Sequence, residues 1–195
     1  MNYKPGDQEC QVSLISSSSR KRSNARELAE TLLQDIEFLE LNLQNLHIRD
    51  FEDHRDDRKW PGLHDDDFNY ALEIIEQSKI IVFAVPIYWY GIPAKLSNFI
   101  ELWSEVLATD HGFKKKMEHK KIILVLVGGD SPKVKGLCIV RQFRYIADFS
   151  NLDFLYYLIG TGNHEMDILQ DKVALNKATE INQRLKRLLN WREIE

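Results

Sequence analysis

Apolar and polar positions along the chain fall into alternating blocks that predict strands and helices in turn. Two runs, residues 80–85 and 122–127, are continuously apolar, which is typical of strands buried on both faces of a parallel sheet. Residues 38–43 alternate between apolar and polar side chains, which indicates a half-buried strand at a sheet edge. A short strand signal at 11–15 and a further predicted strand at 154–159 complete the five predicted strands.

Between these strands, apolar residues recur every three or four positions, as they do on one face of an amphipathic helix. Strands that alternate with helices form a parallel sheet that is covered on both faces. We therefore expect an α/β fold with a five-stranded parallel sheet of order 2-1-3-4-5 and a ligand site between the first and third strands. The predicted helices run from residue 25 to about 33 and over residues 68–77, 93–107, 136–149 and 168–189.

The composition sets limits on the class of protein. A chain of 195 residues can bury a full core, and we expect one domain over residues 1–195. The net charge of −4 and the scattered lysines do not resemble the basic surface of a nucleic-acid binder. No run reaches the ~18 apolar residues of a membrane helix. Residues 1–9 lack the apolar core of a signal peptide, so we expect a cytoplasmic protein that binds neither nucleic acid nor membrane.

Residues that commonly bind metals are present but poorly grouped. Cys10 and Cys138 lie far apart, so they predict neither a disulfide framework nor a cluster, and we interpret both as packing residues, Cys138 on a helix face. His164 lies in a glycine-containing loop and is expected at the surface. Residues 49–67 form a long acidic segment that is either mobile or shaped over a site, and its last aspartates would complement the dipole of the following helix. We expect no metal site.

The loop after the strand at 80–85 is the most informative segment. Pro86, Ile87, Tyr88, Trp89, Tyr90 and Gly91 precede a second proline, Pro93, and then a helical pattern. Large aromatic side chains beside a glycine, at the carboxyl end of a parallel strand, are typical of a site for a planar ligand. The alternative is an ordinary connection whose aromatic rings pack into the core.

The loop after the first strand is rich in hydroxyl groups. It contains Ser18, Ser19, Arg20, Ser23, Asn24 and Ala25 and lies directly before a helix. Hydroxyls, backbone N–H groups and a helix N-terminus together can bind a phosphate, although the loop contains no glycine and is not a Walker or dinucleotide motif. A flexible serine-rich linker is the alternative. Gly128, Gly129 and Asp130 follow the strand at 122–127, so all three loops are expected to converge.

These loops together resemble the flavodoxin-like NAD(P)H-dependent FMN reductase family, which includes the iron–sulfur flavoproteins. The most specific similarity is the segment 86–100, and Asp65-Asp66-Asp67-Phe68 also fits the family pattern. The resemblance implies a flavodoxin-like three-layer sandwich in which the loop at 18–25 holds the FMN phosphate. It also implies that residues 86–91 and 128–130 lie against the two sides of the flavin ring.

Three positions depart from the family pattern. Ser17 stands where glycine is usual, Ala25 stands where threonine often supplies a hydroxyl, and the acidic segment lacks the cysteines that hold a cluster. The resemblance therefore implies FMN and no iron. It further implies a homodimer or homotetramer whose neighbouring chain helps to wall the flavin site.

The function implied by the resemblance is hydride transfer from NAD(P)H, through FMN, to a quinone, flavin or similar small acceptor, by a ping-pong mechanism. A flavin performs this chemistry itself, so no residue is predicted to be catalytic. Two alternatives stay open. The first is an electron carrier of the flavodoxin type, although such carriers are usually far more acidic than −4. The second is a flavin-free regulatory module on the same fold.

Overall fold

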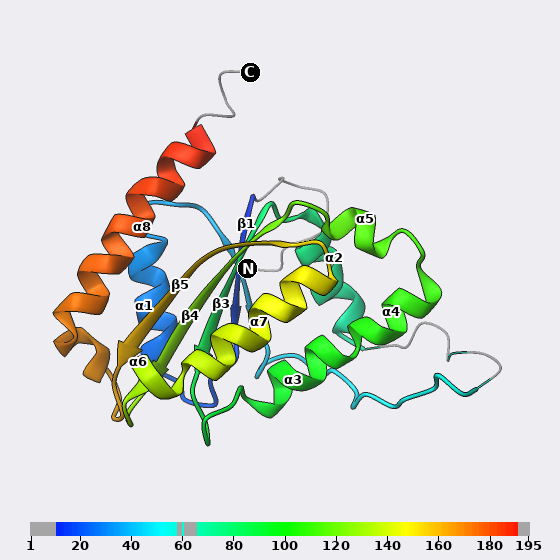
Figure 1. The fold of residues 1–195 in the computed structure, drawn as a ribbon, viewed down its shortest axis with the longest axis horizontal. Coiled ribbons are helices and arrows are strands. Elements are labelled where there is room, and N and C mark those ends of the chain that lie inside the picture. The colour runs from blue at the N-terminus through cyan, green and yellow to red at the C-terminus, as the bar shows by residue number, and fades with distance from the viewer. Residues whose placement is uncertain (1–10, 58–59, 61–65, 191–195) are drawn as a thin grey trace.

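The computed structural model describes residues 11–190 except 58–59 and 61–65, and its strands and helices alternate along the chain (Figure 1). The predictions for Cys10 and Asp65 lie outside the described residues. The strands are β1 (Val12–Ser16), β2 (Leu39–Asn42), β3 (Ile80–Pro86), β4 (Lys121–Gly128) and β5 (Asp153–Thr161). The helices are α1 (Asn24–Leu32), α2 (Phe68–Gln77), α3 (Ala94–Glu101), α4 (Trp103–Thr109), α5 (Phe113–Met117), α6 (Pro132–Lys135), α7 (Leu137–Phe149), the 3-10 turn η1 (Asp167–Gln170) and α8 (Lys172–Asn190).

The sheet has the predicted topology. Among the described residues, five parallel strands pair in the order β2-β1-β3-β4-β5. The central strand β3 is buried along its whole length, as its continuously apolar sequence indicates, whereas β2 lies at the edge and is half-buried. In a parallel sheet all the carboxyl ends lie on one side, so the loops that follow the strands gather there.

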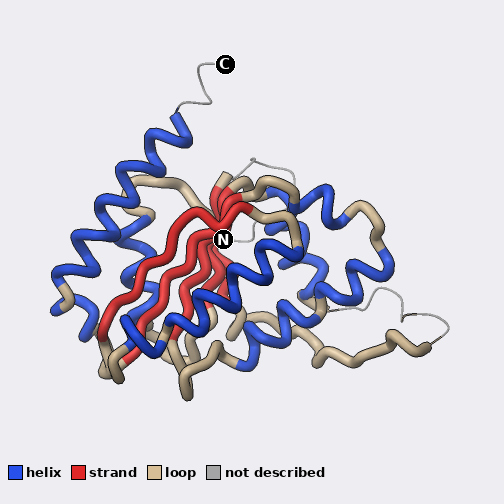
Figure 2. The backbone as a smooth tube through the Cα atoms, in the orientation of Figure 1, coloured by secondary structure: helices blue, strands red, loops and turns tan. Residues whose placement is uncertain are grey.

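Helices cover both faces of the sheet, which gives the three-layer sandwich expected from the sequence (Figures 1 and 2). On one face α1 and α8 enclose a core that includes Leu14, Leu28 and Ala178. On the other face α2, α3, α4 and α7 enclose a second core in which Phe83 packs edge-to-face on Phe143, with ring centroids 5.1 Å apart. The two cores fix the positions of the loops at the carboxyl edge.

The helices differ from the prediction in four places. The helix expected over 93–107 is broken at Leu102 into α3 and α4. The helix expected from residue 168 begins only at Lys172, because residues 167–170 form η1 and Asp171 accepts hydrogen bonds from the N–H groups of Thr161 and Ala174. Short helices α5 and α6 were not predicted. On α5, Phe113 and Met117 are fully buried, whereas the lysines between them are not.

The prediction that Cys138 is a packing residue is wrong. It lies on helix α7, as expected, but its side chain is exposed rather than packed. The thiol donates to the backbone carbonyls of Tyr90, at 3.3 Å, and Lys135, at 3.1 Å. Within the described part of the chain, no helix combines the length and the apolar character needed to cross a membrane.

Candidate flavin site

The loops after β1 and β3 meet at the carboxyl edge of the sheet. The hydroxyl of Tyr88 lies 3.4 Å from Ser18 Oγ and 3.2 Å from Ser19 Oγ, so the two loops share a hydrogen-bonded contact. Burial raises the pKa of Tyr88, but hydrogen bonds with these serines and the charge of Arg20 outweigh burial and leave the pKa below its usual range. The convergence predicted from the strand order is therefore present.

The loop after β3 is a tight turn that presents aromatic side chains. Tyr88 and Gly91 exchange backbone hydrogen bonds of 3.1 and 2.9 Å, and Trp89 and Tyr90 between them have φ angles of 48° and 63°. Two consecutive left-handed residues are typical of a type I′ turn, where glycine or asparagine is usual. Holding two aromatic residues in this conformation costs about 1–3 kcal/mol each, which favours a functional reason for their presence. Trp89 is 96% exposed, so its ring is not tucked into the core.

The loop after β4 closes onto the aromatic turn. Tyr90 donates a hydrogen bond of 2.8 Å to Asp130, and Lys135 forms an ion pair with the same carboxylate. Hydrogen bonds from Lys135 and Tyr90 hold the pKa of Asp130 below its ordinary value. At Gly129 a Cβ atom would lie 2.8 Å from Cβ of Asn163, so this position has no room for a side chain. Glycine therefore allows the loops after β4 and β5 to approach each other closely.

A cavity of about 670 Å³ opens between these loops, and its size lies within the range of small-molecule sites. Seven of the residues predicted for the site line it, which decides that the aromatic and glycine loops share one pocket. The seven are Ile87, Tyr88, Trp89, Tyr90, Gly128, Gly129 and Asp130, and the other lining residues are Pro132, Lys135 and Asn163.

The serine-rich loop borders this cavity and has a defined structure rather than that of a linker. Ser23 caps helix α1, its hydroxyl accepting from the N–H of Arg26 at 3.3 Å. Ser17, where the family usually has glycine, is fully buried and does not adopt a positive φ. Its hydroxyl donates to the carbonyl of Ala84 at 3.3 Å. Serine can therefore replace the usual glycine at position 17, because the backbone there does not need the left-handed conformation that favours glycine.

Some residues predicted for the site have side chains that point elsewhere. Asn24 donates to the carbonyl of His164 at 2.7 Å and accepts from the N–H of Ile168 at 3.3 Å, and Ala25 lies in the core. Pro86 is buried at the end of β3. These residues shape the edge of the sheet, and their side chains do not line the cavity.

The loop after β5 is a wall of the site that the sequence did not predict. Asn163 lines the cavity, and its carbonyl accepts a hydrogen bond from the guanidinium of Arg20. The carboxylate of Asp167 accepts from the N–H groups of Asn163 and His164, which holds the loop in shape. The only available signal was the glycine-containing sequence 160–164 at the end of a parallel strand. The side chain of His164 itself is exposed, as predicted.

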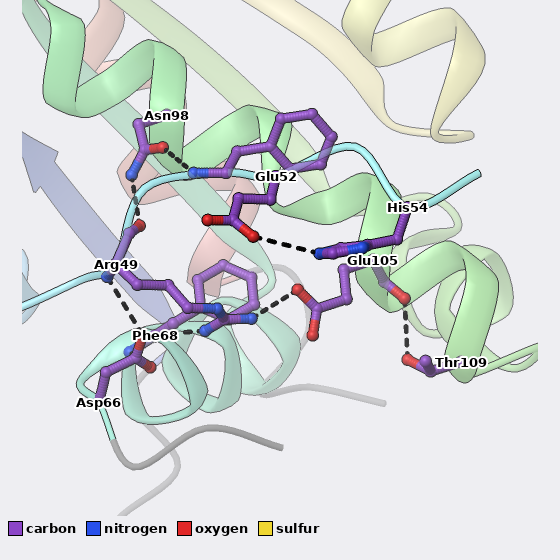
Figure 3. Close-up of polar contacts among 9 residues, drawn as sticks. Arg49, Glu52, His54, Asp66, Phe68, Asn98, Glu105 and Thr109 are labelled. Atoms are coloured by element: carbon purple, nitrogen blue, oxygen red, sulfur yellow. Dashed lines mark hydrogen bonds and ion pairs between the residues drawn. The ribbon is translucent and has the colours of Figure 1, made fainter. Parts of the chain in front are cut away.

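The described part of the acidic segment does not line the cavity. None of the residues that line the cavity belongs to the described part of residues 49–67. Instead, Arg49 binds Asp66 at 2.8 Å and Glu105 at 2.5 Å, which ties the segment to α4 and to the residues before α2 (Figure 3). Asn98 on α3 adds hydrogen bonds to the backbone of Arg49 and Phe51. The described part of this segment is thus a strap over α3 and α4, and it does not cover the cavity of its own chain.

The residues present fit the phosphate and the planar ring of FMN. A hydroxyl-rich loop with Arg20 precedes the nine-residue helix α1, whose N-terminus favours an anion. The adjacent cavity is lined by aromatic rings and by glycines that leave room for a flat ligand. Among the described residues, no group of three or more His, Cys, Asp or Glu side chains could hold a metal ion.

Known proteins share both the sequence and the fold. The Bacillus subtilis protein YwqN, whose name describes an NAD(P)H-dependent FMN-containing oxidoreductase, is 35% identical over 175 residues, which are 89% of this chain and 97% of YwqN. The solved structure of the Trp repressor binding protein from Bacillus subtilis has 32% identity and a TM-score of 0.73, and the match covers 87% of this chain and 96% of that one.

A more distant structure has the same fold. General stress protein 14 from Treponema denticola, solved in complex with FMN, has 16% identity and a TM-score of 0.53 over 92% of this chain and 98% of its own. Residues 10–144 match the family model described as NADPH-dependent FMN reductase, which is more than half of the chain. The chain therefore belongs to the NADPH-dependent FMN reductase family.

Proposed function

We propose that the protein transfers hydride from NAD(P)H through FMN to a quinone, a flavin or a similar small acceptor, by a ping-pong mechanism. Membership of the family makes it an NAD(P)H-dependent FMN oxidoreductase. The observation that carries the finer proposal is the aromatic cavity beside the hydroxyl-rich loop, because a donor and an acceptor that both bind in this cavity must occupy it in turn. Reduced nicotinamide nucleotides are available in the cytoplasm, and we place the reaction there.

The loops divide the work of binding FMN between them. Ser18, Ser19 and Arg20 would hold the phosphate, together with backbone N–H groups of Ser23, Asn24 and Ala25 at the start of α1. The segment 86–91 would lie along one side of the ring and Gly128, Gly129 and Asp130 along the other. FMN, when bound, supplies the hydride chemistry itself. The protein then has to orient the ring, exclude water from one side and leave the other open.

Trp89 provides a test of the shared pocket. Replacing Trp89 with alanine removes the most exposed ring at the mouth of the cavity, and stacking on such a ring contributes about 0.5–1.5 kcal/mol. We expect the apparent KM values for both NAD(P)H and the acceptor to rise about two- to tenfold. Initial-rate kinetics should also give parallel double-reciprocal lines, as ping-pong turnover requires.

The control for Trp89→Ala is Tyr157→Ala, which removes another exposed aromatic side chain, on β5 and away from the cavity. It should change neither KM value. Intersecting lines, or a Trp89→Ala variant that affects only one substrate, would mean that donor and acceptor bind at separate places, and the proposal of one shared pocket would be wrong.

We also propose that the protein forms a homodimer through the face of α3, α4 and α7. A groove of about 410 Å³ between these helices is lined mainly by apolar side chains, including Ile100, Leu107 and Ile146. Tyr145 and Phe149 at its border are 59% and 61% exposed. An apolar surface of this kind on a folded chain is typical of a protein–protein contact.

Phe149→Glu tests this assignment. A charge placed on the apolar face should convert the dimer to a monomer, because burying it without a partner is unfavourable. Light scattering at micromolar protein concentration gives the mass directly. Val173→Glu is the matched control, since Val173 is 70% exposed on α8 over the opposite face of the sheet, and this variant should stay dimeric. A monomeric wild-type protein would contradict the proposed dimer.

A further inference from the structure

Asn163 brings a side-chain amide from the loop after β5 to the wall of the aromatic cavity. The side chain lies against the loop after β4, because a Cβ atom at Gly129 would be 2.8 Å from Cβ of Asn163 and 3.0 Å from both its Cγ and its Oδ1. Glycine at position 129 therefore leaves the space that this amide occupies. The amide thus lies directly beside a segment that is proposed to lie along the flavin ring.

The backbone of Asn163 is held on both sides. The guanidinium of Arg20 donates to its carbonyl, and its N–H donates to the carboxylate of Asp167 at 3.1 Å. Hydrogen bonds from the N–H groups of His164 and Asn163 hold the pKa of Asp167 below its ordinary value, so this carboxylate is ionised at neutral pH. Asn24, at the start of α1, donates to the carbonyl of His164 at 2.7 Å. A residue held in this way presents its side chain in a defined direction, as precise binding of a ligand requires.

The hydroxyls and charges that line the cavity already have partners within the protein. The hydroxyl of Tyr88 contacts the serine-rich loop, and Asp130 binds both the hydroxyl of Tyr90 and the ammonium group of Lys135. By contrast, the side-chain amide of Asn163 has no hydrogen-bond partner among the residues that the structure describes. Its NH2 donor and its carbonyl acceptor are therefore available to a ligand in the cavity.

An amide matches one edge of the flavin ring and not the other. The pyrimidine edge carries an N–H group between two carbonyls, whereas the dimethylbenzene edge is apolar. An asparagine amide can donate to a carbonyl and accept from the neighbouring N–H at the same time, much as it pairs with the edge of adenine. The indole of Trp89 also lines the cavity, but it is a donor only and cannot form this pair.

We infer that Asn163 binds the pyrimidine edge of FMN and thereby determines which way round the ring lies in the cavity. This inference rests on the proposed function, because it takes FMN as the ligand of the cavity. The dimethylbenzene edge then faces away from the loop after β5. Reduced FMN carries more negative charge on its pyrimidine edge than oxidised FMN does, so a hydrogen bond from Asn163 becomes stronger on reduction and raises the reduction potential of the bound flavin.

FMN and 3-methyl-FMN test the hydrogen bond, because they differ only in whether the pyrimidine edge carries an N–H group or a methyl group. In fluorescence titrations of FMN-free protein, the wild-type protein should bind FMN about tenfold more tightly than 3-methyl-FMN. Asn163→Ala has neither the amide nor the bulk that would exclude the methyl group, so its preference should fall below about twofold. His164→Ala is the matched control, since the side chain of His164 is exposed and does not line the cavity. It should keep the wild-type preference.

The reduction potential of the bound flavin gives a second readout, which a merely structural role would not change. In Asn163→Ala the affinity for reduced FMN should fall about tenfold more than the affinity for oxidised FMN, which lowers the two-electron potential by about 30 mV. Equal binding of the two flavins by the wild-type protein would overturn the inference, as would a preference or a potential that Asn163→Ala leaves unchanged. A protein that binds neither flavin would instead contradict the proposed function.

Discussion

Replacing Arg49 with methionine is expected to lower the free energy of unfolding by about 3–5 kcal/mol, because it removes the guanidinium that pairs with two largely buried carboxylates. The side chains of Asp66 and Glu105, which Arg49 binds, are only 5% and 12% exposed (Figure 3). In the wild-type protein, Cζ of Arg49 lies over the ring of Phe68, 5.7 Å from its centroid. Methionine keeps an apolar side chain beside this ring. Chemical denaturation of both proteins at neutral pH measures the difference.

The matched control is Arg55→Met. Arg55 pairs with Asp53 on the same strap, but these side chains are 77% and 42% exposed, so water screens their ion pair and it contributes little to stability. The effect at Arg49 should also decrease in acid. Burial raises the pKa of Asp66, but its hydrogen bonds with Arg49 outweigh burial and keep the pKa low, so the wild-type protein loses this stabilisation as the pH falls through that pKa. An Arg49→Met variant as stable as Arg55→Met would show that the strap is not held by buried charges.

Arg20→Ala is expected to weaken FMN binding about ten- to hundredfold while the protein remains folded. A hydrogen bond to a charged group contributes about 1.5–3 kcal/mol, and loss of the Arg20 guanidinium also removes its bond to the Asn163 carbonyl at the wall of the cavity. Ser18→Ala should weaken binding in the same direction. Equilibrium titration of FMN-free protein with FMN, followed by the change in flavin fluorescence, gives the dissociation constants.

Arg22→Ala serves as the control for this loop. Arg22 lies two residues further on and is largely exposed, with its nearest carboxylate, Glu165, 4.0 Å away. Its replacement should leave the affinity for FMN within about twofold of the wild-type value. If Arg20→Ala and Ser18→Ala bound FMN as tightly as Arg22→Ala does, the phosphate would have to bind outside the serine-rich loop.

The fold was predictable because its central strands are apolar along their whole length. Residues 80–85 and 122–127 can only be buried on both faces, and that condition requires a parallel sheet with helices on each side. The short helix α5 was missed because Phe113 and Met117 are only four residues apart, with three lysines between them. A single helical turn contains too little periodicity to be recognised, and its burial depends on the packing of the second core.

Only those parts of the site whose positions follow from the order of the strands could be predicted. The loops after β1, β3 and β4 converge as the topology requires, whereas the role of Asn163 depends on a contact with Arg20 across 143 residues. The ion pair that attaches the strap to α4 is also a contact between distant residues, since Arg49 and Glu105 are 56 residues apart in the sequence. Ion pairs and loop contacts of this kind arise from tertiary structure and leave no periodic pattern in the sequence.

Anaerobic addition of NADPH to the purified, FMN-loaded protein tests the central claim most directly. If the protein is an NAD(P)H-dependent FMN oxidoreductase, the visible absorbance band of its flavin should bleach with no other protein present, and addition of a quinone should restore it. An electron carrier of the flavodoxin type would keep its flavin oxidised in NADPH and in NADH. A regulatory module on the same fold would be colourless and would not take up FMN, and either of these results would contradict the proposed function.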